Sequence, residues 1–200
     1  MKSEAYIWFD AEFSSLDLEQ ASLLQVAAII TDRELRPLDE HAVVDWVIKI
    51  EAQTEVSPWV ATHLSELVNR CRSAEALDVE AVDRLLDQWV SGYFPEKQSA
   101  FEKRPILAGN SIHNDWWMVR RHLPLFASQL HYRLLDVSTL KTLWADASPH
   151  APFNKEDKEM LERYGIEPSI ETLKPHDALF DIQASIAELA YYRHKMGWTL

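Results

Sequence analysis

Two carboxylates near the start of the sequence have the type and spacing of metal ligands. Asp10 and Glu12 stand two positions apart at the end of the apolar run Tyr6-Ile-Trp-Phe. In a β-strand, side chains at i and i+2 point to the same face, so both carboxylates would project together. Such neighbours repel each other unless a cation lies between them. The pair therefore indicates a site for Mg²⁺ or Mn²⁺, although a bare Asp-x-Glu also occurs where a strand simply enters a polar loop.

Two further acids and a histidine occupy positions that fit the same chemistry. Asp115 follows Gly109 closely, at an expected strand-to-helix turn, and Asp181 lies in the first turns of the last expected helix. His176 precedes Asp181 by five positions, or about 140° on a regular helix. Both can face one site only if His176 lies in the loop before the helix. There it could act as a general base beside metal-bound carboxylates.

The strands that must position these residues are visible as five apolar, β-branched segments. The first three are separated by short turns and predict an antiparallel meander, whereas the last two alternate with helical patterns. This order predicts an α/β fold with a mixed sheet and helices on its faces. The expected strands are residues 5–10, 24–31, 43–50, 105–109 and 134–137.

Helical periodicity fills most of the remaining sequence. Ser57 and Pro58 predict an N-cap and a first helical residue, and Ser138 or Thr139 is expected to cap a later helix. Residues 146–172 are charged and contain proline, so we expect an insertion or flap, with one helix near 155–164, on a single domain spanning 1–200. The other expected helices are residues 58–70, 74–91, 114–122, 139–146 and 177–195.

Composition limits the classes of function. The net charge of −12 argues against a protein that grips long nucleic acid, because such proteins need a basic face. A nucleic-acid substrate would therefore be short and held by a few contacts and by metal. No apolar stretch approaches the ~20 residues of a membrane span, and the sequence starts without a signal-like apolar region, so we expect a cytoplasmic protein. Cys71 is the single cysteine, which excludes an internal disulfide and a thiolate zinc site.

In their order along the chain, the motifs resemble the DEDDh 3′→5′ exonucleases and, among them, the oligoribonucleases. The resemblance implies a ribonuclease-H-like fold, with Asp10, Glu12, Asp115 and Asp181 holding two divalent cations, Mg²⁺ or Mn²⁺, and His176 as the base. The expected products are 5′-mononucleotides. The matching segments are Asp10-x-Glu12, Gly109-Asn-Ser-Ile112 with Asp115, His131-Tyr-Arg-Leu-Leu-Asp-Val-Ser-Thr-Leu-Lys141, His176 with Asp181, and Ala187-Glu-Leu-Ala-Tyr-Tyr-Arg193.

The same resemblance implies residues that bind a dinucleotide. Leu16 and Trp59 match apolar residues that pack on the two bases. The positions around the 5′-phosphate are matched by His63, Ser111, Arg133 and Ser138. In the family the arginine reaches the partner subunit's site, which implies a homodimer. A capped 5′-phosphate would favour dinucleotides over longer strands.

Departures from the family pattern keep alternatives open. The segment from Phe13 to Leu16 is Phe-Ser-Ser-Leu, whereas Met-Thr-Gly-Leu is typical of the family. RNA dinucleotides are the substrate we expect first, and DNA dinucleotides are the main alternative. An exonuclease for longer strands and a non-catalytic nucleotide-binding descendant are further alternatives. Asp136 and Asp177 lie near the motifs but are expected to cap helices or stabilise the fold.

Overall fold

β1 (Ala5–Phe13) is the central strand of a five-stranded sheet with the order β3-β2-β1-β4-β5. The computed structural model describes residues 5–95, 101–148, 150–165 and 177–198. β2 (Leu23–Asp32) and β3 (Val43–Val47) continue from β1 as an antiparallel meander. β4 (Ile106–Gly109) pairs with β1 in parallel, and β5 (Leu134–Asp136) pairs with β4 in parallel. The predicted mixed α/β sheet is confirmed.

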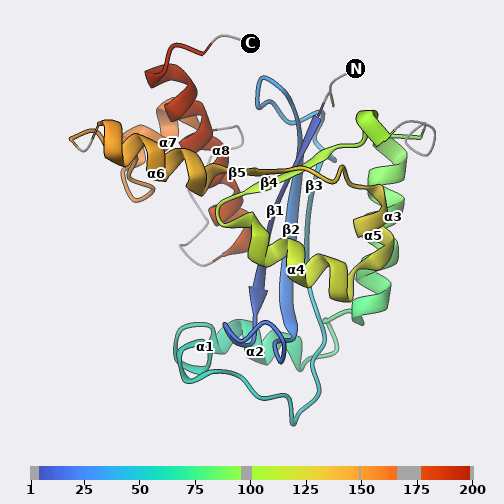
Figure 1. The fold of residues 1–200 in the computed structure, drawn as a ribbon. Helices are drawn as coiled ribbons and strands as arrows, with labels where there is room; N and C mark the ends of the chain where they lie inside the picture. Colours follow the sequence, from blue (N-terminus) through green and yellow to red (C-terminus); the bar gives the residue numbers. More distant parts are fainter. Residues whose placement is uncertain (1–4, 96–100, 149, 166–176, 199–200) are drawn as a thin grey trace.

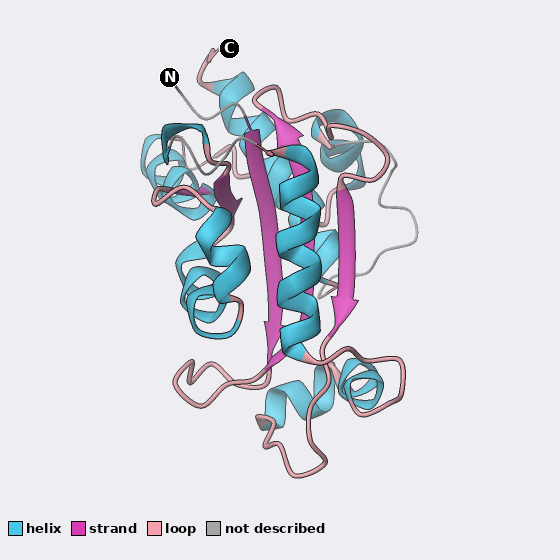
Figure 2. Cartoon of the chain, turned by 90° about the vertical axis from the view of Figure 1, so that its right-hand side faces the viewer, coloured by secondary structure: helices cyan, strands magenta, loops and turns pink. Residues whose placement is uncertain are grey.

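Helices cover both faces of this sheet (Figures 1 and 2). One layer contains α3 (Val79–Tyr93), α4 (Ile112–His122) and α5 (Pro124–Gln129). The opposite layer contains α6 (Val137–Ala147), α7 (Lys158–Tyr164) and α8 (Ala178–Lys195). Two short helices, α1 (Pro58–His63) and α2 (Ser65–Cys71), lie beyond the C-terminal end of β1, and a 3-10 turn, η1 (Phe101–Lys103), precedes β4. Among the described residues, none of the helices is long and apolar enough to cross a membrane.

The alternation of side chains along β1 decides where its two acids point. Tyr6 and Trp8 are buried in the core cluster shared with α8, whereas Phe9 belongs to the cluster under α3, α4 and α5. Asp10 and Glu12 continue the even-numbered register of Tyr6 and Trp8. The carboxylates therefore emerge on the α8 face, just where the apolar part of the strand ends.

The helix after β3 differs from the single helix that the sequence predicts. Ser57 is its N-cap as expected, with Val60 N donating to Ser57 Oγ at 3.3 Å. At Leu64, however, φ is −117° and ψ is 27°, which lie outside the helical range and divide the segment into α1 and α2. Leu64 is buried, so packing overrides the helical pattern at this residue.

Two other helix boundaries also differ from expectation. Asp136, not Ser138 or Thr139, caps α6, because its carboxylate accepts the N–H of Ser138 at 2.9 Å. α4 ends at His122 as expected, but Pro124 then begins α5, a helix that was not expected; proline suits this position because it lacks the N–H that a first helical residue does not need. Asp177 caps α8 through Leu179 N at 3.0 Å, which confirms its predicted capping role.

The described part of the expected insertion is packed against α8. Phe153 is buried and its ring lies 5.7 Å from that of Tyr191. The carbonyl oxygen of Ala151 accepts bonds from Trp144 Nε1 at 2.6 Å and from Tyr191 OH at 2.7 Å. These contacts fix the chain just before α7, on the same side of the sheet as Asp10 and Glu12.

Candidate active site

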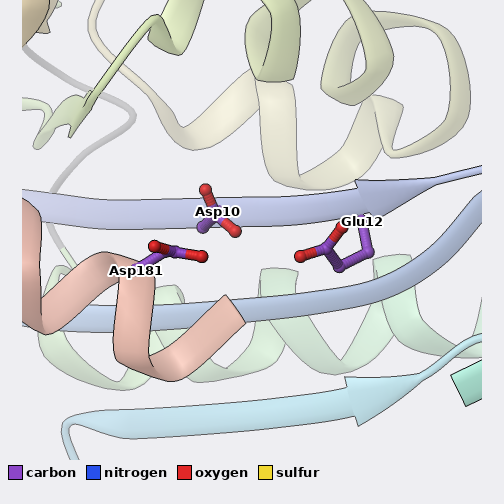
Figure 3. A group of neighbouring side chains, drawn as sticks. All are labelled: Asp10, Glu12 and Asp181. Carbon is purple, nitrogen blue, oxygen red and sulfur yellow. The ribbon is translucent and has the colours of Figure 1, made fainter. Parts of the chain in front are cut away.

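Asp10, Glu12 and Asp181 form an acidic cluster between β1 and α8 (Figure 3). One carboxylate oxygen from each residue lies within 4.8 Å of the others. Asp181 reaches the strand because it lies in the first turn of α8, whose start is fixed by the Asp177 cap. Three converging carboxylate oxygens are a donor set suited to Mg²⁺ or Mn²⁺.

Asp115 is held beside this cluster by the end of β1. Its side chain is buried, and Oδ1 accepts the N–H of Ala11 at 3.0 Å. β1 pairs with β4 only as far as Trp8, so the next part of that strand edge has no β4 partner. The Asp115 carboxylate thus takes the place of the carbonyl acceptor that a neighbouring strand would provide. This bond also anchors α4 to β1.

A tight turn between β4 and α4 makes this placement possible. A Cβ on Gly109 would lie 2.9 Å from the carbonyl oxygen of Phe9 and 3.0 Å from Cδ1 of Ile112. Ser111 follows with a left-handed φ of 50°, which is unfavourable for a residue with a side chain. Its N–H donates to Asp136 Oδ1 at 3.0 Å, and this bond helps to hold the strained residue.

Burial and mutual repulsion raise the pKa values of the site acids. Burial, followed by Asp181 and Asp177, raises the pKa of Glu12 to about 7. The pKa of Asp115 is about 8, again mainly through burial, with backbone N–H bonds opposing the shift. Burial and the charges of the other site acids hold the pKa of Asp10 well above its ordinary value. A divalent cation would stabilise the ionised form of these carboxylates, which fits a site built to bind one.

One cation in the described part of the chain reaches the cluster. Lys155 Nζ lies 2.8 Å from Asp181 Oδ1, and its charge lowers the pKa values of Asp10 and Glu12. Sequence reasoning missed this residue, because it lies in a charged segment where no periodicity or motif distinguishes it from the lysine at position 158.

A cleft of about 550 Å³ leads away from the acids. Ser111 and Ser138 line it, as does Asn110, whose side-chain N donates to Glu188 at 2.9 Å and whose oxygen accepts from Ser138 Oγ at 3.1 Å. Ser138 Oγ also lies 3.2 Å from Ser111 Oγ. The cleft therefore offers hydroxyl groups near the carboxylates, where a phosphate could be bound.

The expected base-packing residues lie beyond the C-terminal end of β1, the end that carries Glu12. Leu16 is 92% exposed and Trp59 is 47% exposed. Ser57 N donates to Ser14 O at 2.8 Å, which joins the start of α1 to the loop that carries Leu16. Trp59 stacks on His63 with ring centroids 4.6 Å apart. None of these three side chains lines the cleft beside the acids.

Of the other predicted residues, Arg133 is not part of this arrangement. Arg133 is exposed, lies over the ring of Tyr132 at 5.4 Å and does not line the cleft. His176 lies outside the described residues, so its expected position in the loop before α8 stays a prediction. Ser15, at the family's glycine position, has no positive φ, so this loop does not need a glycine there.

Fold and acidic cluster together define a ribonuclease-H-like nuclease. The family model for exonucleases matches residues 7–189, and the chain belongs to this exonuclease family. Within the family it is an oligoribonuclease-like member, because several curated relatives named oligoribonuclease are 29–35% identical to it over most of its length.

Three relatives illustrate the extent of the match. The oligoribonuclease of Vibrio cholerae is 35% identical, with 94% of this chain and 92% of the relative covered. The oligoribonuclease of Corynebacterium diphtheriae is 34% identical, with 96% and 83% covered. A probable oligoribonuclease of Schizosaccharomyces pombe is 35% identical over 94% of this chain, which spans 66% of that relative.

Solved structures agree on the fold. Exonuclease I from Methylocaldum szegediense superposes with a TM-score of 0.67 at 20% identity, covering 97% of this chain and 41% of the larger one. Escherichia coli exonuclease I, solved with a dT13 oligonucleotide, gives a TM-score of 0.68 at 17% identity, with 98% and 42% covered. At these identities the likeness concerns the fold, and this chain spans less than half the length of either protein.

Proposed function

We propose that the chain is a 3′→5′ exonuclease that hydrolyses very short RNA, chiefly 5′-phosphorylated dinucleotides, to 5′-mononucleotides. The observation that carries this proposal is the convergence of Asp10, Glu12 and Asp181 in a chain whose curated relatives are oligoribonucleases. An acidic protein with a polar cleft of about 550 Å³ suits a short substrate better than a long one.

In this proposal Asp10, Glu12, Asp115 and Asp181 hold two divalent cations, Mg²⁺ or Mn²⁺. Bound there, the cations supply a water of lowered pKa and neutralise charge on the phosphate. The protein contributes fixed geometry: Asp115 is held by Ala11 N, and Asp181 by the capped start of α8. His176 receives the proton from the attacking water, as the general base at the end of the preceding loop.

Substrate recognition is divided between two groups of residues. The hydroxyl groups of Ser111 and Ser138 lie in the cleft and donate to the 5′-phosphate. Leu16 and Trp59, beyond the end of β1, pack on the bases, with His63 beside Trp59. The exposed Arg133 completes the phosphate cap of a second copy, so we propose a homodimer.

Hydrolysis assays test the proposal. Initial rates would be measured with Mn²⁺ for 5′-phosphorylated RNA and DNA dinucleotides and for seven-residue oligomers of each. The matched control is Asp10→Asn, which keeps the shape of the side chain and removes its charge. We expect the RNA dinucleotide to be cleaved fastest and Asp10→Asn to abolish cleavage.

Other outcomes separate the alternatives. Preference for the DNA dinucleotide would leave the mechanism intact and move the specificity to DNA. Faster cleavage of the seven-residue oligomers would favour an exonuclease for longer strands. Absence of Asp10-dependent cleavage would contradict catalysis and leave a nucleotide-binding protein. Light scattering of the wild type and of Arg133→Ala tests the dimer separately.

A further inference from the structure

Lys155 forms an ion pair with an acid of the proposed metal site. Its ammonium group lies 2.8 Å from Asp181 Oδ1, and the two side chains are 46% and 19% exposed. Lys155 also lines the cleft together with Asp10 and Asp181. The contact therefore lies in the cleft, at the edge of the acidic cluster.

The backbone that carries Lys155 is firmly attached to the rest of the molecule. Phe153, two residues earlier, is buried in the core cluster shared with α8. Asp157, two residues later, caps α7 through the N–H groups of Glu159 and Met160. The position of Lys155 is thus set on both sides, while its half-exposed side chain has room to swing toward solvent.

The charge of Lys155 acts on the whole cluster. Neighbouring acids raise the pKa values of Asp10 and Glu12, and among the described residues Lys155 is the cation that opposes this effect at both carboxylates. The other lysine of the cleft, Lys141, is paired with Glu188 at 3.4 Å instead. Lys155 is therefore placed to neutralise the cluster before any metal ion binds.

We propose that Lys155 is a resident counter-cation of the acidic cluster, and that a divalent cation must displace its ammonium group from Asp181 in order to bind. The inference rests on the proposed metal site. A carboxylate oxygen that ligates a metal ion cannot keep a lysine ammonium at hydrogen-bonding distance without strong like-charge repulsion. Displacement costs free energy, so Lys155 lowers the affinity for the metal and keeps the site neutralised when metal is scarce.

Calorimetric titration with Mn²⁺ tests this competition without any substrate. Lys155→Met removes the charge but keeps a long side chain that can pack along the cleft. We expect it to bind Mn²⁺ about tenfold more tightly than the wild type, as expected for losing one partly screened charge near the ion. Lys155→Arg retains the charge and should stay close to the wild-type affinity. Lys158→Met removes an equal charge from the first residue of α7 and controls for net charge.

The outcomes separate this inference from the proposed function. Equal or weaker Mn²⁺ binding by Lys155→Met, with binding still lost in Asp10→Asn, overturns the role of Lys155 and leaves the metal site standing. A gain in Lys158→Met as large as in Lys155→Met also overturns it, because the effect is then one of net charge. If neither the wild type nor any variant binds Mn²⁺, both proposals are overturned.

Discussion

The carboxylate of Asp115 accepts the backbone N–H of Ala11 at 3.0 Å, a bond between residues 104 positions apart. One side chain thereby serves two purposes, since it completes the hydrogen bonding of β1 and lies beside the acidic cluster. The charge and the fold are coupled at this residue. The effect of a substitution at Asp115 must therefore be measured on both the activity and the stability of the protein.

Asp115→Asn separates these two roles. The amide oxygen can still accept the N–H of Ala11, so we expect the melting temperature in EDTA to stay the same or rise, because the cost of burying an ionisable carboxyl group is removed. Activity should fall by about 100-fold or more, as expected for loss of a group that stabilises the reacting charge. Thermal unfolding and initial rates on the RNA dinucleotide check the two expectations. A large fall in melting temperature would contradict the coupling described here.

Gly109→Ala is expected to damage the site through the backbone. The added Cβ would meet the carbonyl oxygen of Phe9 at 2.9 Å, and backbone cannot give way as a flexible side chain can. We expect about 1–3 kcal/mol of lost stability and reduced activity, because α4 carries Asp115. Gly92→Ala is the matched control: it has open space in α3 and should stabilise by about 0.5–1 kcal/mol. Urea unfolding of both variants provides the comparison.

Metal affinity should rise with pH. In the metal-free protein the pKa of Glu12 is about 7 and that of Asp115 is about 8, so both hold protons over part of the neutral range. A metal ion must displace these protons, so its affinity increases from pH 6 to pH 8 by about tenfold per pH unit for each proton released. Titrations in two buffers of different ionisation enthalpy would count the protons. An affinity independent of pH would contradict the raised pKa values.

Glu12→Gln should stabilise the metal-free protein at high pH. A carboxyl group whose folded-state pKa is raised favours folding below its unfolded pKa, and that contribution is lost as pH rises through the folded value of about 7. In EDTA at pH 8 we therefore expect the variant to be more stable than wild type by on the order of 2 kcal/mol, with little difference at pH 4. With Mn²⁺ the order should reverse, because the variant has lost a ligand. Thermal melts at both pH values test this.

Trp59→Ala should weaken substrate binding more than the chemical step. Loss of stacking on one base costs ~1–3 kcal/mol, so KM is expected to rise about 5-fold to 100-fold while kcat changes little. Trp117→Ala is a suitable control, since Trp117 is similarly exposed but belongs to α4. Steady-state kinetics on the RNA dinucleotide would decide. Equal effects in both variants would argue against a specific base contact by Trp59.

Local sequence patterns were sufficient to predict the sheet and the positions of Asp10 and Glu12 on it. The apolar run ending at Asp10 fixes both the strand and the face on which Asp10 and Glu12 emerge, because strand periodicity is a short-range property. Asp181 could be placed for a similar reason, since α8 begins at a recognisable polar cap.

Features that depend on tertiary packing could not be predicted in this way. The break at Leu64 occurs within an unbroken helical pattern and arises from burial of its side chain. The contact between Lys155 and Asp181 joins two segments with no shared pattern, and the burial of Phe153 that supports it was not evident in a charged stretch. Such contacts are decided by the assembled core.

The acidic cluster joins the first strand of the chain to its last helix, and this has a consequence during protein synthesis. While the ribosome is still adding the residues of α8, the nascent chain already contains Asp10 and Glu12 but lacks the third carboxylate. N-terminal elements emerge first, at a rate of about 5–20 residues per second. The proposed metal site therefore cannot be completed until α8 has been translated and has docked on the sheet, so nuclease activity should appear only after that step.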